Sequence, residues 1–211
     1  AQQAWLGLIR TLNGQGRPEE AETALQAALE ALPEALDLLW AQASFRERAG
    51  NYEGAIEIYE AMYERAPNSE VVANNLASLL STYRDDDVSL ERAWIVARRL
   101  RGIAFPPFQD TYGWLAYRRG DYDVALDHLE PAAAGLPDDP LVQFHLGMTY
   151  AALERTEDAL EQLNQALEIA GEEDTRAQFD TAREEIARLE ALVAAEAEAE
   201  AAETDGAAGS D

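Results

Sequence analysis

The sequence contains neither cysteine nor lysine, so all 16 basic residues are arginine. Without cysteine the chain can form no disulfide and no zinc–thiolate site, and it has no thiol nucleophile. Without lysine it cannot carry the phosphate-binding P-loop motif. No stretch approaches about 18 consecutive apolar residues, so the sequence predicts no membrane-spanning helix.

Positive charge is also scarce. The 41 acidic residues outnumber the arginines and give a formal net charge of −25, which repels a phosphate backbone or an anionic lipid surface. We therefore expect no nucleic-acid partner and no direct membrane insertion. Apolar residues, mostly alanine and leucine, make up 47% of the chain, and there are only eight prolines. This composition predicts an all-α protein with an ample core.

What the sequence does contain is an internal repeat. An alanine followed four residues later by an apolar or aromatic residue recurs at Ala21-x3-Leu25, Ala55-x3-Tyr59, Ala93-x3-Ala97, Ala125-x3-Leu129 and Ala159-x3-Leu163. The alanines are separated by 34, 38, 32 and 34 residues. Such a period is typical of stacked helical hairpins. We therefore expect two amphipathic helices in each repeat.

Glycine and proline mark the ends of these predicted helices. The turn glycines are Gly16, Gly50 and Gly120, and the closing prolines are Pro33, Pro67 and Pro137. Because glycine commonly ends a helix and proline follows one, the sequence predicts hairpins over 2–33, 36–67, 69–105, 108–137 and 140–170. Small residues recur where the two helices of a hairpin must approach closely, at Ala43, Ala77, Gly113 and Gly147.

The repeat register stops after Gly171, but helical spacing continues. The apolar positions are Phe179, Ala182, Ile186, Leu189 and Val193. We predict a capping helix over 172–195, because the last hairpin of a stack would otherwise expose its core to water. The rest of the chain, 196–211, is predicted to be an acidic, disordered tail.

The units resemble the tetratricopeptide repeat pattern, which reads W-x2-L-G-x2-Y, then A-x3-F, then P. Trp5-x2-Leu8 and Leu146-Gly147-x2-Tyr150 each match part of the first half, and the repeated alanine element and closing proline match the second. The resemblance covers about residues 2–170. It implies a right-handed superhelix, an α-solenoid of about five hairpins, whose first helices line a concave groove.

A narrower resemblance rests on Val72–Ala77, Asp110–Leu115 and Tyr117–Tyr122. These segments are similar to the C-terminal repeats of bacterial exported tetratricopeptide proteins of cell-envelope and exopolysaccharide assembly. The resemblance favours a periplasmic or envelope-associated location over a cytoplasmic one. The chain begins at Ala1 without a methionine, inside a predicted helix, so we interpret it as a fragment or a processed form.

The groove lining is predicted from positions i, i+4 and i+7 of the first helices, opposite the core. The candidate partner-binding residues are Trp40, Ser44, Glu47, Arg48, Asn74, Asn75, Ser78, Asp110, Trp114, Tyr117, Arg118, Phe144 and Met148, with Leu6, Arg10 and Asn13 at the same positions of the first hairpin. The aromatic members are the expected anchors, because aromatic side chains carry much of the energy of protein interfaces.

These candidates have structural alternatives. The aromatic residues would otherwise pack between adjacent hairpins, and the capping helix could cover Phe144 and Met148. Asn74 and Asn75 fit either a grip on an extended peptide backbone or a hydrogen bond between helices. The arginines at 10, 48 and 118 could hold a partner carboxylate, although the lysine-rich clamp of chaperone-binding relatives is absent.

No set of catalytic or metal-binding residues stands out. His128 and His145 are the only histidines, their spacing fits neither a metal site nor a triad, and we expect both at the surface. Asp85-Asp86-Asp87 lacks the spacing of a calcium loop and predicts a solvated loop before a helix capped by Ser89. We therefore predict no enzymatic activity, no cofactor and no metal.

The sequence thus predicts a non-catalytic scaffold that binds a peptide or partner domain in its concave groove, as part of a bacterial envelope assembly. Two alternatives remain open. The chain could be a structural subunit that self-associates through Trp5 and Leu8 at its N-terminal end, or a regulatory arm of a larger enzyme.

Overall fold

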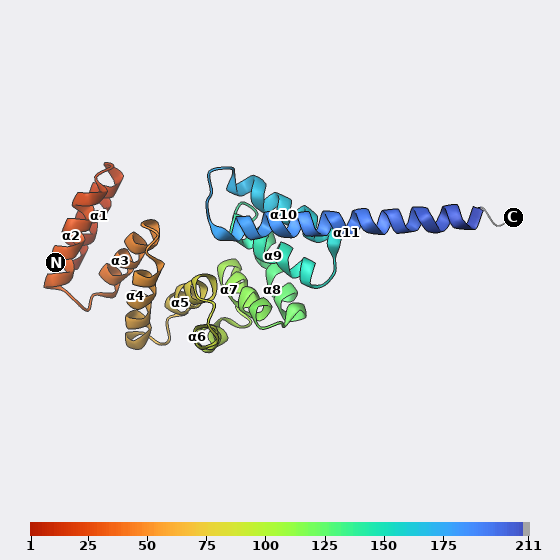
Figure 1. Cartoon of the computed structure of the whole chain (residues 1–211). Helices are drawn as coiled ribbons and strands as arrows, with labels where there is room; N and C mark the ends of the chain where they lie inside the picture. Colours follow the sequence, from red (N-terminus) through yellow and green to blue (C-terminus); the bar gives the residue numbers. More distant parts are fainter. Residues whose placement is uncertain (209–211) are drawn as a thin grey trace. The chain divides into compact units, whose positions relative to one another are not determined.

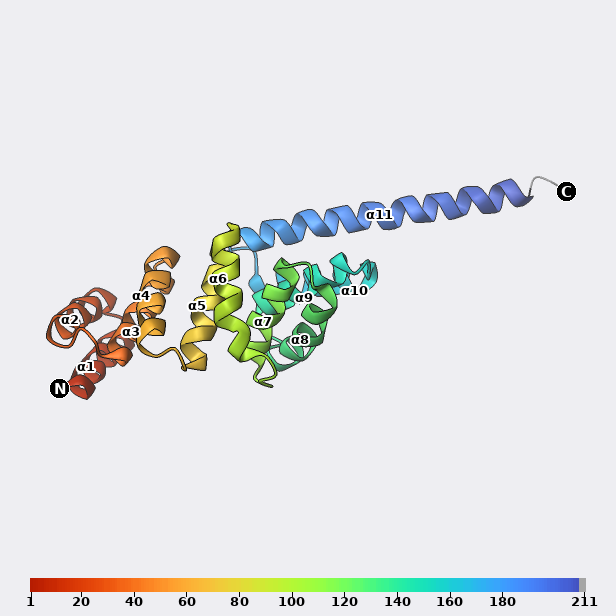
Figure 2. The ribbon, with the colours of Figure 1, turned by 90° about the horizontal axis from the view of Figure 1, so that it is seen from below.

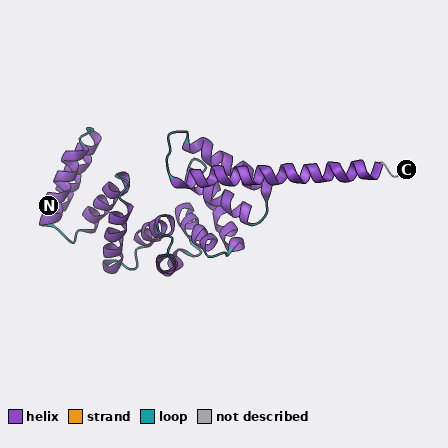
Figure 3. Ribbon diagram, in the orientation of Figure 1, coloured by secondary structure: helices purple, strands orange, loops and turns teal. Residues whose placement is uncertain are grey.

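The computed structural model describes the backbone of residues 1–208 and the side chains of residues 1–199. In this part of the chain every regular element is a helix, which confirms the predicted all-α class (Figure 3). The helices are α1 (Gln2–Gly14), α2 (Pro18–Ala31), α3 (Leu36–Arg48), α4 (Tyr52–Arg65), α5 (Glu70–Tyr83), α6 (Asp87–Ala97), the 3₁₀ turn η1 (Arg98–Leu100), α7 (Pro106–Arg118), α8 (Tyr122–Gly135), α9 (Pro140–Ala152), α10 (Thr156–Ala170) and α11 (Ala177–Ala208). No helix within the described residues is long and apolar enough to cross a bilayer.

The helices form two compact units, Ala1–Leu100 and Arg101–Asp211. Unit 1 contains the hairpins α1–α2, α3–α4 and α5–α6, and unit 2 contains α7–α8 and α9–α10 followed by α11 (Figure 1). Within each unit the second helix of one hairpin packs on the first helix of the next. The predicted site residues all lie on the first helices of the hairpins, which are α1, α3, α5, α7 and α9.

Four of the five hairpin turns contain a left-handed residue, and the α5–α6 turn does not. Gly16, Gly50 and Gly120 have φ angles of 70°, 69° and 81°, which glycine adopts without a steric penalty. In the fifth hairpin, 34 residues after Gly120, Glu154 occupies the same position with φ of 59°. A side chain with a Cβ atom is strained in this region, so this turn keeps the repeat geometry at an energetic cost.

Helix starts follow local capping chemistry. Oδ1 of Asp139 accepts hydrogen bonds from the backbone N–H groups of Leu141 and Val142 at the start of α9, with Pro140 at the first helical position. The expectation that Ser89 caps α6 is wrong. Asp86 is the cap, and its Oδ1 accepts from the N–H of Ser89 at 2.9 Å, because its carboxylate is placed to satisfy that free donor.

Close approach within the hairpins explains the small residues. A Cβ atom built on Gly113 would lie 2.7 Å from Cγ of Leu129, and one built on Gly147 would lie 2.7 Å from Cγ of Leu163. The repeat alanines on the facing helices are fully buried, at 21, 55, 93, 125 and 159. A larger side chain at either kind of position would force the two helices apart, as the sequence predicted.

The C-terminal helix differs from its prediction. We expected a capping helix over 172–195 and a disordered tail over 196–211, but a single helix, α11, runs over Ala177–Ala208 and extends past α7–α10 of its unit (Figure 2). Alternating alanine and glutamate, both strong helix formers, continue the helix beyond the core. Residues 209–211 of the predicted tail lie outside the described residues. Phe179, Ala182, Ile186 and Leu189 are buried in the core of unit 2.

Candidate functional site

A pocket of about 390 Å³ lies between α1 and α3 in unit 1. We call it the α1–α3 groove. Its apolar lining comes from Leu6, Ile9, Trp40, Ala41 and Phe45, and its polar lining from Gln3, Arg10, Asn13, Asp37, Ser44 and Arg48. The groove thus brings together Trp40, Ser44 and Arg48 with the first-hairpin positions that the same register predicted. Trp40 is half-buried, and its ring meets the ring of Tyr59 edge-on at 5.6 Å.

The charges of the groove are unevenly satisfied. Within the described residues neither Arg10 nor Arg48 forms an ion pair. Nε of Arg10 donates to the backbone carbonyl of Leu6, and the guanidinium of Arg48 lies 4.7 Å from the centre of the Phe45 ring. Elsewhere in unit 1, guanidinium groups meet carboxylates, as in the 2.6 Å contact between Arg92 and Glu60. The groove therefore presents two cationic side chains without an anionic partner from the described chain.

Three predicted residues of unit 1 form a hydrogen-bond chain instead of an open surface. The Tyr59 hydroxyl donates to Oε1 of Glu47 and accepts from Nδ2 of Asn75, both at 2.9 Å. Nδ2 of Asn74 in turn donates to Oδ1 of Asn75 at 3.2 Å. Burial is the main reason that the pKa of Tyr59 is raised. These hydrogen bonds connect α3, α4 and α5. Asn75 therefore forms a hydrogen bond between helices, which was the structural alternative to gripping a peptide.

Two other candidates of unit 1 do not join the groove. Oδ1 of Asn74 is buried and has no hydrogen-bond partner among the described residues. Ser78 is half-buried, and its backbone carbonyl accepts from the hydroxyl of Ser81 at 3.0 Å. A peptide in the α1–α3 groove would therefore meet Trp40 and Ser44 without needing either of these α5 residues.

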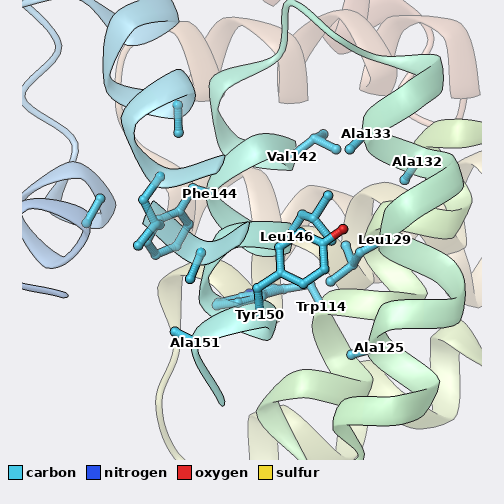
Figure 4. Close-up of a cluster of buried hydrophobic side chains, with 14 of the residues drawn as sticks. Trp114, Ala125, Leu129, Ala132, Ala133, Val142, Phe144, Leu146, Tyr150 and Ala151 are labelled. Atoms are coloured by element: carbon cyan, nitrogen blue, oxygen red, sulfur yellow. The ribbon is translucent and has the colours of Figure 1, made fainter. Parts of the chain in front are cut away.

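In unit 2 the predicted aromatic anchors belong to the core. Trp114 is 8% exposed and Phe144 is 3% exposed, and both lie among the buried residues of α7, α8 and α9 (Figure 4). Trp114 is stacked on Tyr117 with ring centroids 4.7 Å apart. The prediction that Trp114 and Phe144 face an open groove is therefore wrong, because neighbouring rings fill the space in front of them.

The capping helix contributes to this closure. Half-buried Met148 and Tyr117 pack against the same cluster that contains Phe179 of α11. Burial raises the pKa of Tyr117, and the negative charge of Glu185 on α11 adds to the effect. Arg118 is half-buried at the end of α7. The first-helix face of unit 2 is thus largely occupied by its own chain.

His145 was missed by sequence reasoning, which placed it at the surface. It is 4% exposed, its Nδ1 lies 2.8 Å from Oδ1 of Asp110, and its ring is stacked on Trp114 with centroids 4.1 Å apart. The repeat register contains a usable signal, because His145 precedes Gly147 by two residues as Asn75 precedes Ala77. Both positions carry polar side chains that bond inside the stack. Asp110, a predicted groove residue, serves as this internal partner.

The candidate residues therefore divide between the units. The α1–α3 groove is an accessible pocket of unit 1, and the corresponding residues of unit 2 are mostly packed. The predicted continuous groove from Trp40 to Met148 crosses from one unit to the other and stays a prediction.

Comparisons with known proteins identify the repeat. A family model described as tetratricopeptide repeat matches residues 3–70 and 113–175. A thermophilic tetratricopeptide protein of Thermus thermophilus is similar in structure, with 26% identity, a TM-score of 0.59, and coverage of 86% of this chain and 98% of that one. A comparison with proteins of curated function finds no match.

Two further solved structures share the fold at lower identity. YrrB, a tetratricopeptide protein with an unusual peptide-binding site, is 18% identical with a TM-score of 0.57, over 85% of this chain and 90% of that one. PilW, a type IV pilus biogenesis factor, is 14% identical with a TM-score of 0.64, over 92% of each chain. The family match, the helical hairpins and these neighbours agree, and the chain belongs to the tetratricopeptide repeat family.

Proposed function

We propose that this chain is a non-catalytic scaffold that holds a segment of another protein in the α1–α3 groove. The observation that carries the proposal is the groove itself, a pocket of about 390 Å³ lined by Trp40, Phe45, Arg10 and Arg48. Ligand pockets are typically lined by apolar side chains together with a few well-placed polar groups, and this groove has that composition. Aromatic and arginine side chains are enriched among the residues that dominate interface energy.

The fold supports this placement. Stacked hairpins present their first helices as an extended binding surface, and α1 and α3 are the first helices of their hairpins. The peptide-binding site of YrrB belongs to a protein of the same fold. An envelope role remains the finer part of the proposal. It rests on the resemblance of residues 70–150 to exported proteins, and fractionation of source cells with an antibody to this chain would test it.

The absence of cysteine gives a direct test of the groove. A Ser44→Cys variant would carry the only thiol in the chain and could be labelled there with a photo-crosslinker. The matched control is Glu57→Cys, at an exposed position of α4 outside the groove. Illumination in an extract of source cells should give discrete protein adducts from the Ser44→Cys variant only. Equal adducts from both variants, or none from either, would contradict the proposal that a protein segment binds in the α1–α3 groove.

A second candidate function is self-association through the N-terminal hairpin. Leu8 of α1 is 44% exposed, whereas Trp5 is half-buried against the core of the hairpin. Sedimentation velocity over a range of concentrations tests this candidate. Association that Leu8→Glu abolishes would support it, and a strict monomer would exclude it.

A further inference from the structure

We infer that the occupant of the α1–α3 groove is a partner segment in which acidic side chains lie to one side of a large apolar side chain. This inference rests on the proposed function and names the partner class of the same site. The length of the groove, the order of its lining residues and the two arginines support it.

The groove runs along two helices that lie side by side. Its lining positions extend from Gln3 to Asn13 on α1 and from Asp37 to Arg48 on α3. At 1.5 Å per residue these stretches are roughly 15 Å long. An extended peptide rises about 3.3 Å per residue, so about four or five residues fit along the groove. The occupant is therefore a short segment.

The lining changes in character along this length. Nε2 of Gln2 donates to Oδ2 of Asp37 at 2.6 Å, which brings the N-terminal ends of α1 and α3 together. Leu6 and Trp40 follow about one turn later, and Arg10 and Arg48 lie toward the C-terminal ends. The groove thus has an acidic end, an apolar middle and a basic end. A complementary segment places its large apolar residue in the middle and its acids at the basic end.

Carboxylates are the natural partners of the two arginines. A guanidinium presents a planar fork of donors that matches a carboxylate, and the described chain supplies no carboxylate to Arg10 or Arg48. A nucleic acid would offer phosphates, but the net charge of −25 repels a long polyanion. A short peptide with one or two acids carries far fewer negative charges and is repelled less. Screening at physiological salt also weakens its repulsion from acidic groups more than about 8 Å away.

The experiment selects ligands without assuming one. Random heptapeptides displayed on phage, with their C-termini fused to the coat so that only side chains supply carboxylates, are panned on the full chain. Enriched peptides should carry glutamate or aspartate two to four positions to one side of a large apolar residue, and the same side should recur among them. The double variant Arg10→Gln/Arg48→Gln should lose this enrichment. The matched control, Arg65→Gln, changes an exposed arginine of α4 outside the groove and should retain it.

Affinities then test the charge directly. An enriched peptide and its glutamine-substituted twin are synthesised with blocked ends and measured by fluorescence anisotropy. The acidic peptide should bind wild type about tenfold more tightly than its twin, and each single arginine variant should lose about fivefold to tenfold for the acidic peptide only. The advantage of the acidic peptide should shrink as salt is raised.

The outcomes distinguish a failure of the acidic-partner inference from a failure of the proposed scaffold function. Enriched peptides without acidic residues would overturn this inference and leave the scaffold function standing. No enrichment at all would count against both. Sedimentation velocity covers the other occupant: concentration-dependent association that the double arginine variant abolishes would assign the groove to a second copy of the chain and would overturn the inference.

Discussion

His145 of α9 and Asp110 of α7 are joined through the core of unit 2, with Nδ1 of the imidazole 2.8 Å from Oδ1 of the carboxylate. The imidazole ring is also stacked on Trp114. One buried polar contact therefore connects the first helices of two successive hairpins. Buried polar groups of this kind are expensive to leave without a partner.

Asp110→Ala should destabilise unit 2 by about 1–3 kcal/mol, because it leaves the buried imidazole without its hydrogen-bond partner. Urea unfolding followed by circular dichroism measures the change. The control is Asp127→Ala, which removes an exposed carboxylate of α8 and should alter the free energy of unfolding by less than about 0.5 kcal/mol. Equal effects of the two variants would show that the pair adds nothing specific.

Two glycine-to-alanine changes should have opposite signs. At Gly147 the new methyl group would lie within 2.8 Å of two side-chain atoms of Leu163 and 3.1 Å from its backbone nitrogen, so we expect a loss of about 1–3 kcal/mol. At Gly7, inside α1, nothing lies within 4 Å of the new Cβ atom. There the higher helix propensity of alanine should stabilise the protein by about 0.5–1 kcal/mol. Thermal unfolding of both variants checks the pair, and a stabilising Gly147→Ala would contradict the close helix contact.

Replacing the strained residue in the turn of the fifth hairpin should stabilise the protein. Glu154→Gly places glycine where φ is 59° and should raise the free energy of unfolding by up to about 1 kcal/mol, since relief of strain exceeds the added entropy of the unfolded chain. The reverse change, Gly120→Ala at φ of 81°, should cost about 1–2 kcal/mol. Denaturant midpoints measure both. A neutral Gly120→Ala would show that these turns relax readily.

The hydroxyl of Tyr59 should stabilise unit 1 through its two partners. Tyr59→Phe keeps the ring beside Trp40 but deprives Asn75 of its acceptor and Glu47 of its donor, so we expect a loss of about 1–2 kcal/mol. Tyr52→Phe is the matched control, because its ring stacks on Tyr83 and its hydroxyl has no hydrogen-bond partner among the described residues. Chemical unfolding followed by tryptophan fluorescence compares them. Equal stabilities would mean that the hydrogen-bond chain contributes no net stability.

Stability should also fall at alkaline pH, in part through Tyr150. Burial and the hydrogen bond that its hydroxyl donates to Glu130 raise the pKa of Tyr150 to about 12. An unfolded tyrosine has a pKa of about 10, so the folded chain holds this proton more tightly. The resulting stability is fully present below about pH 10 and is lost as pH rises toward 12. Tyr150→Phe should therefore lose less stability than wild type between these values. Ultraviolet absorbance titration measures the pKa of the tyrosine. If the stability of wild type and of Tyr150→Phe fell in parallel between pH 10 and 12, the prediction would be contradicted.

The architecture could be predicted because its determinants are local and periodic. The repeated alanines recur in all five hairpins, and turn glycines mark three of them. The length of α11 was underestimated because charge suggested disorder, whereas the helix propensity of alanine and glutamate extends the helix to Ala208.

The state of the groove face was harder to predict. Trp40 and Phe144 occupy the same position of their hairpins, three residues before a small residue. One is half-buried beside a pocket and the other is buried in a core. The difference depends on the rings and helices that pack in front of each residue, and those come from distant parts of the sequence. A register therefore gives the direction of a side chain but not its neighbours.

The shared register of Trp40 and Phe144 has a consequence for how this chain could change over generations. The same backbone position carries a pocket-lining ring in one hairpin and a core ring in another, so the hairpin fold accepts different surroundings at this position. The side chains that line the α1–α3 groove are distinct from the repeat alanines that hold the hairpins together. Transplanting its eleven lining side chains onto another hairpin pair would test whether the groove can be moved between scaffolds.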